Sequence, residues 1–222
     1  MPRLEDAIIP LPEPFGNLVV RDTLDGTPPT LPKTEEVLKQ TVNDLKTRQF
    51  ANSLPRLEYL QKQRPGEPDL LILRGCIYAE SGKPEAAEKL FIKAIEIAPS
   101  HPWARLNLAE AQMAQKKYQE AEKTLTILRL TRPESEVVRF KLILSQVLQK
   151  KFTEAEQELQ GMNPEATTPA SFFAQAAIAF AKGQTAGGES AVDRAENLYK
   201  ENQTGYFRTA LAIYGWLPAN PQ

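Results

Sequence analysis

A repeat of 34 residues limits the fold of this chain more than any other feature of its sequence. Pro65, Pro99 and Pro133 are spaced by this distance, and four further series of residues repeat with the same period. Because stacked units must repeat their packing positions, coincident series at one period indicate an array of equivalent structural units. The other series are Phe50, Pro84, Tyr118 and Phe152; Ser53, Ala87, Ala121 and Ala155; Leu57, Phe91, Leu125 and Leu159; and Leu60, Ala94, Leu128 and Met162.

Each unit is predicted to be a pair of α-helices. A small residue such as Ala87 lets two helices approach closely, and large apolar residues four and seven positions later continue the same helix face. The proline series ends the second helix, since proline lacks the N–H that a helix interior requires. The best copy carries Leu71, Gly75, Tyr78, Ala87, Phe91, Ala94 and Pro99.

This copy resembles the tetratricopeptide repeat (TPR) family, whose pattern runs bulky, small, aromatic, small, aromatic, small, proline. The resemblance implies an all-α fold, a right-handed α-solenoid of four TPR-like helix hairpins and a degenerate fifth, with a C-terminal capping helix. Three arginines stand where the family prefers leucine or another bulky apolar residue, and two polar residues stand at the first small-residue crossing. These departures are Arg74, Arg105, Arg139, Gln40 and Thr41.

Four kinds of segment are predicted along the chain. Residues 1–33 hold seven of the 18 prolines and form an extended proline-rich N-terminal arm, after which Thr34 is the expected N-cap of the first helix. A fifth hairpin is expected to contain an enlarged turn through Gly187 and Gly188. The repeats are assigned to residues 34–67, 68–101, 102–135 and 136–163, the fifth hairpin to 164–200, and the capping segment to 201–222.

Composition argues against several other classes of protein. Lys and Arg number 27 and Asp and Glu number 28, so no field of one sign recruits nucleic acid or an anionic membrane. Cys76 is the only cysteine, which excludes an internal disulfide. No apolar run approaches the roughly 20 residues of a membrane-spanning helix. We expect a cytoplasmic protein by default, or a periplasmic or secreted one if a signal peptide has been removed.

A basic ridge recurs at the predicted hairpin tips. Cations are favoured at the C-terminal ends of helices, and glutamates follow closely, so local neutralisation is expected. Because the basic residues are not interleaved with exposed aromatic residues, nucleic acid is not predicted as a partner. The ridge comprises Arg48, Lys83, Lys116, Lys117, Lys150, Lys151 and Lys182.

We predict no catalytic residue, no metal site and no cofactor. His101, the only histidine, lies in a predicted turn, where a solvated side chain is favoured over a catalytic base. A zinc site built on two histidines and a phosphate-binding glycine loop are both missing from the sequence. The carboxylates recur at repeat spacing, which pairing on helix surfaces already explains. The chain is therefore not expected to be an enzyme.

The first helix of each hairpin carries an apolar stripe beside its packing stripe. In a TPR-like stack these helices line the concave surface, so the stripe predicts a groove that binds a protein or peptide. Tight packing between helices is the alternative explanation. Trp103 adds an aromatic anchor, and Asn107 and Lys141 add polar groups. The predicted groove residues are Leu38, Val42, Ile72, Cys76, Trp103, Leu106, Asn107, Glu110, Met113, Phe140, Lys141, Leu144 and Val147.

The resemblance also narrows the class of partner. Some TPR proteins hold the C-terminal carboxylate of a partner with polar groups at fixed groove positions. Asn107 and Lys141 match two of these positions, whereas Ile72, Cys76 and Val137 place apolar or thiol groups at three others. We therefore predict that the groove binds an apolar or amphipathic peptide or helix, which makes the chain an interaction scaffold or adaptor.

Other functions stay open at this stage. The C-terminal tail is expected to pack as a capping helix, but its apolar residues would also serve a self-associating structural subunit. The N-terminal arm would alternatively fold back into the groove, in the same molecule or a neighbouring one. An accessory domain of an enzyme or of an envelope assembly system is a further alternative. The tail residues are Tyr206, Phe207, Tyr214 and Trp216, and the apolar arm residues are Ile8, Ile9, Leu11, Phe15, Leu18, Val19 and Val20.

Overall fold

The computed structural model describes residues 32–47, 49–162 and 168–218. Over these residues it contains eleven α-helices and no strand. The described chain falls into two compact units, an N-terminal unit up to Ala104 and a C-terminal unit from Arg105 onward. The predicted N-terminal arm lies outside the described residues, apart from the two residues that begin α1 (Pro32–Lys46).

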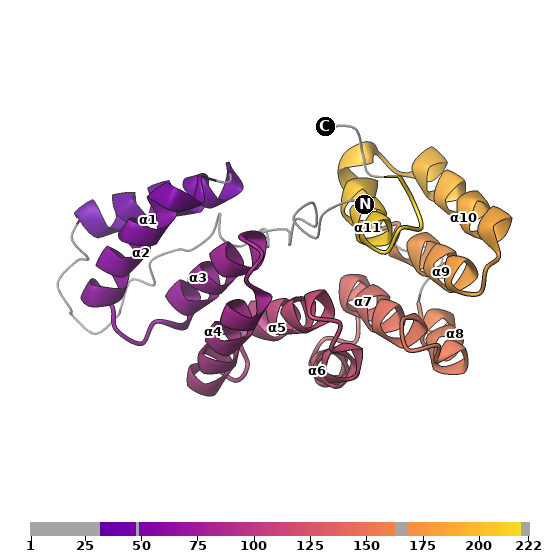
Figure 1. The fold of residues 1–222 in the computed structure, drawn as a ribbon, viewed down its shortest axis with the longest axis horizontal. Coiled ribbons are helices and arrows are strands. Elements are labelled where there is room, and N and C mark those ends of the chain that lie inside the picture. The colour runs from indigo at the N-terminus through magenta and orange to yellow at the C-terminus, as the bar shows by residue number, and fades with distance from the viewer. Residues whose placement is uncertain (1–31, 48, 163–167, 219–222) are drawn as a thin grey trace. The chain divides into compact units, whose positions relative to one another are not determined.

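The N-terminal unit contains two helix pairs, α1 with α2 (Phe50–Gln63) and α3 (Pro68–Glu80) with α4 (Pro84–Ile97) (Figure 1). Three of these helices begin with proline, which the first turn accepts because the N–H that proline lacks has no helical partner there. The prediction of Thr34 as N-cap is wrong, since α1 begins at Pro32 and Thr34 lies inside its first turn.

Small residues set the close crossing of α3 and α4. A Cβ atom added to Gly75 would lie 2.4 Å from the ring of Phe91, so a side chain at this position would displace the ring. Phe91, Ala87 and Ala94 have no exposed surface. Because a side chain in such a tight crossing cannot be enlarged without strain, the small residues of the repeat have a direct structural cause.

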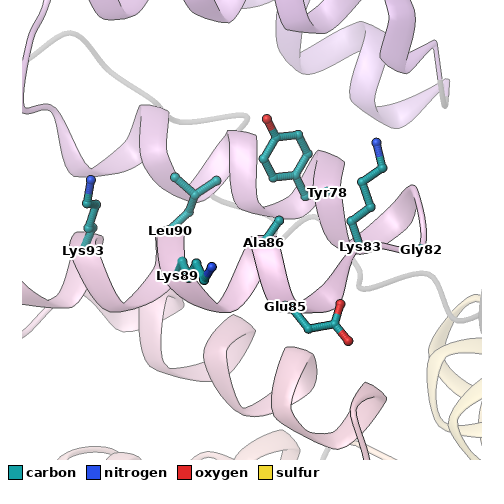
Figure 2. A pocket seen from close by; sticks show the side chains of 8 residues that line it. All are labelled: Tyr78, Gly82, Lys83, Glu85, Ala86, Lys89, Leu90 and Lys93. Carbon is teal, nitrogen blue, oxygen red and sulfur yellow. The ribbon is translucent and has the colours of Figure 1, made fainter.

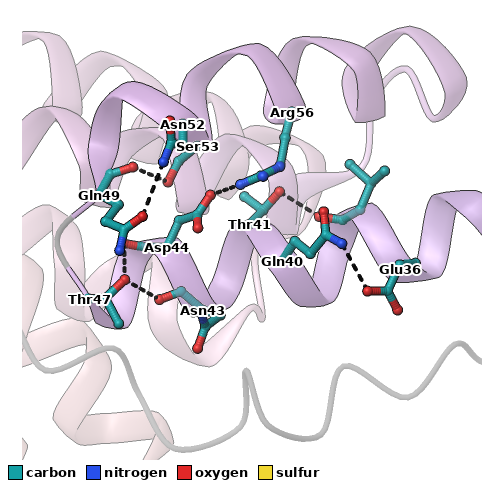
Figure 3. A network of polar contacts seen from close by, with 11 residues as sticks. Glu36, Gln40, Thr41, Asn43, Asp44, Thr47, Gln49, Asn52, Ser53 and Arg56 are labelled. Carbon is teal, nitrogen blue, oxygen red and sulfur yellow. Dashed lines mark hydrogen bonds and ion pairs between the residues drawn. The ribbon is translucent and has the colours of Figure 1, made fainter.

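Polar contacts join α1 and α2, the pair that departs most from the small-residue pattern (Figure 3). Thr41 is fully buried, and its hydroxyl donates a hydrogen bond of 2.7 Å to the carbonyl of Val37 in its own helix. The buried carboxylate of Asp44 pairs with Arg56 of α2. Thr41 and Asp44 can therefore occupy the crossing because their buried polar atoms have partners.

The C-terminal unit is centred on α7 (Glu136–Val147) and α9 (Ala170–Ala181). Nine of the twelve residues in each of these helices are buried, so both are covered on nearly every side. Their apolar side chains belong to one continuous core cluster. The other helices are α5 (Pro102–Ala114), which starts in the N-terminal unit, α6 (Tyr118–Thr131), α8 (Phe152–Gln160), α10 (Thr185–Leu198) and α11 (Glu201–Ile213).

Two of the arginines that depart from the TPR pattern are held by acidic or amide groups. The guanidinium of Arg139 donates to the Glu158 carboxylate at 2.8 Å and to the backbone carbonyl of Pro133 at 3.1 Å. Arg74 donates to the side chain of Gln61 at 2.9 Å. These arginines therefore tie neighbouring elements together by polar contacts where the family uses apolar packing.

The predicted enlarged turn through Gly187 and Gly188 is wrong, because both glycines lie in α10. The turn that precedes α10 contains Gly183, whose φ of +76° favours glycine. Gly188 instead permits a close helix crossing, since a Cβ atom there would lie 2.5 Å from the ring of Phe180. The pair repeats the contact of Gly75 with Phe91, but with the glycine on the second helix.

Candidate functional site: the face covered by α11

The helix α11 covers one face of the C-terminal unit with its apolar side. Phe207, Ala210 and Leu211 are buried, whereas Asn202 and Gln203 on the first turn are exposed. The side chain of Gln203 accepts a hydrogen bond of 3.2 Å from the backbone N–H of Lys200, which fixes the start of the helix. The sequence thus builds an amphipathic helix with a defined start.

Phe207 is the apolar anchor of this helix. Its ring lies 5.0 Å from the ring of Phe140 on α7 in an edge-to-face arrangement and 5.6 Å from the ring of Phe173 on α9 in a stacked one. Both neighbouring rings are fully buried. Aromatic pairs at these distances add to the free energy that burial of the rings already contributes. Phe207 therefore joins α11 to the two central helices of the unit.

Three polar side chains from three helices meet beside this anchor, and we call them the polar triad: Glu110 of α5, Lys141 of α7 and Tyr206 of α11. The Tyr206 hydroxyl donates to Glu110 Oε1 at 2.9 Å, and Lys141 Nζ lies 3.1 Å from the same oxygen. The ammonium of Lys141 also lies 4.8 Å from the centre of the Tyr206 ring. The Glu110 carboxylate is thus neutralised by the Lys141 ammonium and accepts a hydrogen bond from the Tyr206 phenol.

Burial and charge both act on the Tyr206 hydroxyl. Withdrawal from water raises the pKa of Tyr206 well above its usual value, and the nearby Glu110 carboxylate raises it further. The hydroxyl therefore stays protonated at neutral pH and remains a hydrogen-bond donor to Glu110.

The residues after α11 continue along the same unit. Gly215, with a φ of +73°, turns the chain so that the backbone N–H of Trp216 donates to the Leu211 carbonyl at 3.2 Å. The Trp216 ring then stacks on Phe180 of α9, with 6.4 Å between ring centres. Burial raises the pKa of Tyr214, with smaller contributions from Tyr118 and Glu110. All four predicted tail residues therefore contact their own chain.

Most of the predicted groove residues are not on an open surface of the structure. Trp103, Leu106 and Glu110 are half-buried. Only Glu110, Phe140 and Lys141 are brought together around α11 by the contacts described above. Their role in binding a partner stays a prediction, and the burial of the stripe agrees with packing between helices. The ten buried residues are Leu38, Val42, Ile72, Cys76, Asn107, Met113, Phe140, Lys141, Leu144 and Val147.

His101 has a structural environment. Its Nε2 atom lies 2.8 Å from a carboxylate oxygen of Asp69, and its Nδ1 atom accepts a hydrogen bond of 3.3 Å from the backbone N–H of Trp103. The expected solvated turn residue is therefore a half-buried side chain that connects α3 with the start of α5. Within the described ranges no three His, Cys, Asp or Glu residues gather as metal ligands, and no helix there could span a membrane.

Comparisons with known proteins agree with this architecture. Two sequence models described as tetratricopeptide repeats match residues 43–102 and 78–142. The chain belongs to the TPR family. No curated protein sequence matches it significantly. The match includes Glu110, Phe140 and Lys141 of the covered face, but the helix α11 that covers it lies outside the matched residues.

Solved structures of other TPR proteins share the fold at low sequence identity. MamA (residues 41 to the end) from Desulfovibrio magneticus RS-1 is 16% identical in sequence and superposes with a TM-score of 0.62. The superposition includes 76% of the residues of this chain and 96% of the residues of the MamA chain. TTC0263, a thermophilic TPR protein from Thermus thermophilus, is 17% identical, covers 83% of this chain and 100% of its own, and has a TM-score of 0.63. These likenesses establish an all-α TPR fold.

Proposed function

We propose that this protein is a non-catalytic scaffold or adaptor that binds an amphipathic helix of another protein on the face that α11 covers. TPR arrays are in general protein-interaction modules, and the family assignment supports that class for this chain. The finer proposal rests on one observation: an amphipathic helix of the chain itself already occupies the face, with Phe207 between two aromatic rings.

The chemistry of the covered face defines the ligand. Phe140 and Phe173 receive an aromatic side chain, and the adjacent Glu110 accepts a hydrogen bond from a phenol or a similar donor. A partner helix that places an aromatic residue next to a hydroxyl donor reproduces both contacts. Such a partner competes with α11, so its apparent affinity depends on the fraction of molecules in which α11 has left the face.

The experiment uses a fluorescent peptide of residues 200–217 and the full chain. Tyr206→Ala in the protein removes the bond to Glu110 and weakens α11 without changing the face. The variant is expected to bind the peptide about tenfold more tightly than the wild-type chain, since a larger fraction of its faces is open. Asn202→Ala, on the exposed side of the first turn of α11, is the matched control and is expected to behave as wild type.

Two readouts make this result specific. A peptide with Phe207→Asp is expected to lose binding, because a carboxylate cannot be accommodated between two buried rings. Circular dichroism must show that all protein variants keep the helix content of the wild type. Equal peptide binding by the wild-type chain and the Tyr206→Ala variant would contradict the proposal.

Exchange of α11 between two copies is the second candidate function. The tail residues Tyr206 and Phe207 bind the face of their own chain. If the same contacts formed between two chains, the protein would be a self-associating subunit. Sedimentation of the full chain distinguishes the two: a dimer that Tyr206→Ala dissociates supports exchange, whereas a monomer supports the binding of a foreign helix.

A further inference from the structure

A pocket in the N-terminal unit lies on the hairpin of α3 and α4 and has a volume of about 630 Å³ (Figure 2). The pocket is an open depression, so a ligand would lie along its surface and would not be enclosed. Tyr78, Ala86 and Leu90 supply an apolar floor, and Lys83, Lys89 and Lys93 supply three ammonium groups. The pocket therefore combines a small apolar surface with concentrated positive charge.

The side chains that line this pocket have a net positive charge, from three lysines and the single carboxylate of Glu85. Lys83, Lys89 and Lys93 are exposed, and no ion pair joins them to another residue of the described chain. Figure 2 shows Glu85, the one acidic residue of the lining, pointing away from the side on which Tyr78, Leu90 and Lys93 lie. The guanidinium of Arg74 lies 5.8 Å from the centre of the Tyr78 ring, but it pairs with Glu58 at 3.6 Å and is not part of the lining.

Equivalent lysines in the C-terminal unit behave differently. At other hairpin tips of the predicted basic ridge, Lys151 pairs with Glu122 at 2.6 Å and Lys182 pairs with Glu156. The expectation of local neutralisation holds at those two tips but not at Lys83. The position of a lysine at a hairpin tip therefore does not decide whether it is paired.

We propose that this pocket binds an acidic peptide segment that carries an aromatic or branched aliphatic side chain. Charge complementarity selects carboxylates, and the floor of Tyr78 and Leu90 accommodates the apolar side chain. Lys89 and Lys93 are one helical turn apart, about 6 Å along α4, which is close to the distance of about 6–7 Å between alternate residues of an extended peptide. Two acidic residues separated by one residue can thus reach both lysines.

A peptide explains the pocket better than a nucleic acid does. Nucleic acid binding depends on a basic groove that follows many phosphates and on several aromatic side chains that stack with successive bases. Here the basic residues of the lining come from one hairpin, and Tyr78 is the one aromatic residue among them. The proposal does not depend on the function of α11, because the pocket is formed entirely within the N-terminal unit.

The test measures fluorescence anisotropy with the full chain and a labelled octapeptide of Asp and Glu with one central Phe. The double variant Lys89→Glu, Lys93→Glu is expected to bind at least tenfold more weakly than the wild-type chain. The matched control, Lys62→Glu with Lys123→Glu, makes the same change in net charge at exposed positions outside the pocket and is expected to retain binding within twofold.

Three further probes decide the chemistry. The same peptide with Asn and Gln in place of Asp and Glu, and a peptide with Ser in place of Phe, are each expected to bind more weakly than the original. A labelled oligothymidylate of eight nucleotides is expected not to bind. The proposal is overturned by absence of binding to the acidic peptide, by equal loss in both double variants, or by oligothymidylate binding that depends on Lys89 and Lys93.

Discussion

Lys141 of the C-terminal unit and two lysines of the N-terminal unit lie in opposite environments. In the C-terminal unit α11 covers the hairpins, so Lys141 is only 6% exposed and lies 3.1 Å from the Glu110 carboxylate. In the N-terminal unit Lys89 and Lys93 are exposed beside a pocket. An ammonium group withdrawn from water needs a partner, whereas a solvated one does not. The comparison indicates that a charged side chain stabilises the fold where another helix covers the repeat. Where no helix covers the repeat, the same kind of side chain is free to bind a ligand.

The largest effect is expected from Phe207→Ala, which removes the ring between Phe140 and Phe173. We expect the free energy of unfolding of the C-terminal unit to fall by about 4 kcal/mol, since large-to-small substitutions leave cavities. Urea denaturation followed by circular dichroism measures it. Leu198→Ala on α10 is the control, because Leu198 is 67% exposed and its loss should cost less than about 0.5 kcal/mol. Similar losses for both variants would show that α11 is not packed on the core.

Removal of one member of the polar triad is expected to have the next largest effect. Lys141→Ala leaves the Glu110 carboxylate without its cation, and the free energy of unfolding should fall by about 3 kcal/mol. Lys151→Ala breaks a more exposed pair with Glu122 and should cost less than about 1 kcal/mol. Chemical denaturation of both variants compares the pairs. Equal costs would indicate that water reaches the triad as readily as it reaches Lys151.

The contribution of Tyr206 to the free energy of unfolding should decrease at alkaline pH. The pKa of Tyr206 is raised in the folded state, mainly by burial and further by Glu110, so the unfolded state releases this proton first. Stability from this group is complete below the unfolded pKa of about 10 and falls by about 1.4 kcal/mol per pH unit above it. Tyr206→Phe should be less stable than wild type at pH 7, and the gap should narrow above pH 10. Denaturation curves with a constant gap would contradict the burial of this hydroxyl.

The smallest effect is expected at the pocket of the N-terminal unit. Lys89→Ala and Lys93→Ala should each change the free energy of unfolding by less than about 0.5 kcal/mol, because both side chains are exposed and have no described ion pair. Thermal denaturation of the two variants checks this. A loss comparable to that of Lys141→Ala would mean that these lysines support the fold, and the contrast between the units would then disappear.

The helix pairs could be predicted because their packing residues recur in the sequence. Gly75 and Ala87 mark a crossing that admits no larger side chain at Gly75, and the next two units again have alanine at the position of Ala87. Residues such as Thr41 depart from the pattern without breaking it, because a local hydrogen bond satisfies the hydroxyl. The 34-residue period was therefore sufficient to predict how the two helices of a hairpin pack against each other.

The contacts of α11 could not be predicted in the same way. The hydrogen bond from Tyr206 to Glu110 joins residues 96 positions apart. Because this contact does not recur in the repeats, the 34-residue period cannot predict it. An apolar stripe such as that of Phe140 and Leu144 has the same sequence pattern whether it faces water, a partner or a helix of its own chain. The sequence indicated that the C-terminal tail would pack against its own chain. It did not indicate the surface on which the tail packs, because that surface depends on the rotation between successive hairpins, which no single residue determines.

Hydrogen exchange of the full chain with added peptide tests the central claim most directly. The peptide of residues 200–217 is made with heavy isotopes, so mass spectrometry distinguishes it from the α11 of the protein. At saturating peptide we predict that the amides of the protein's own α11 lose protection while those of α7 and α9 keep theirs, because one helix replaces another on an unchanged face. Unchanged protection of α11 at saturation would contradict the account and leave α11 as a permanent part of the fold.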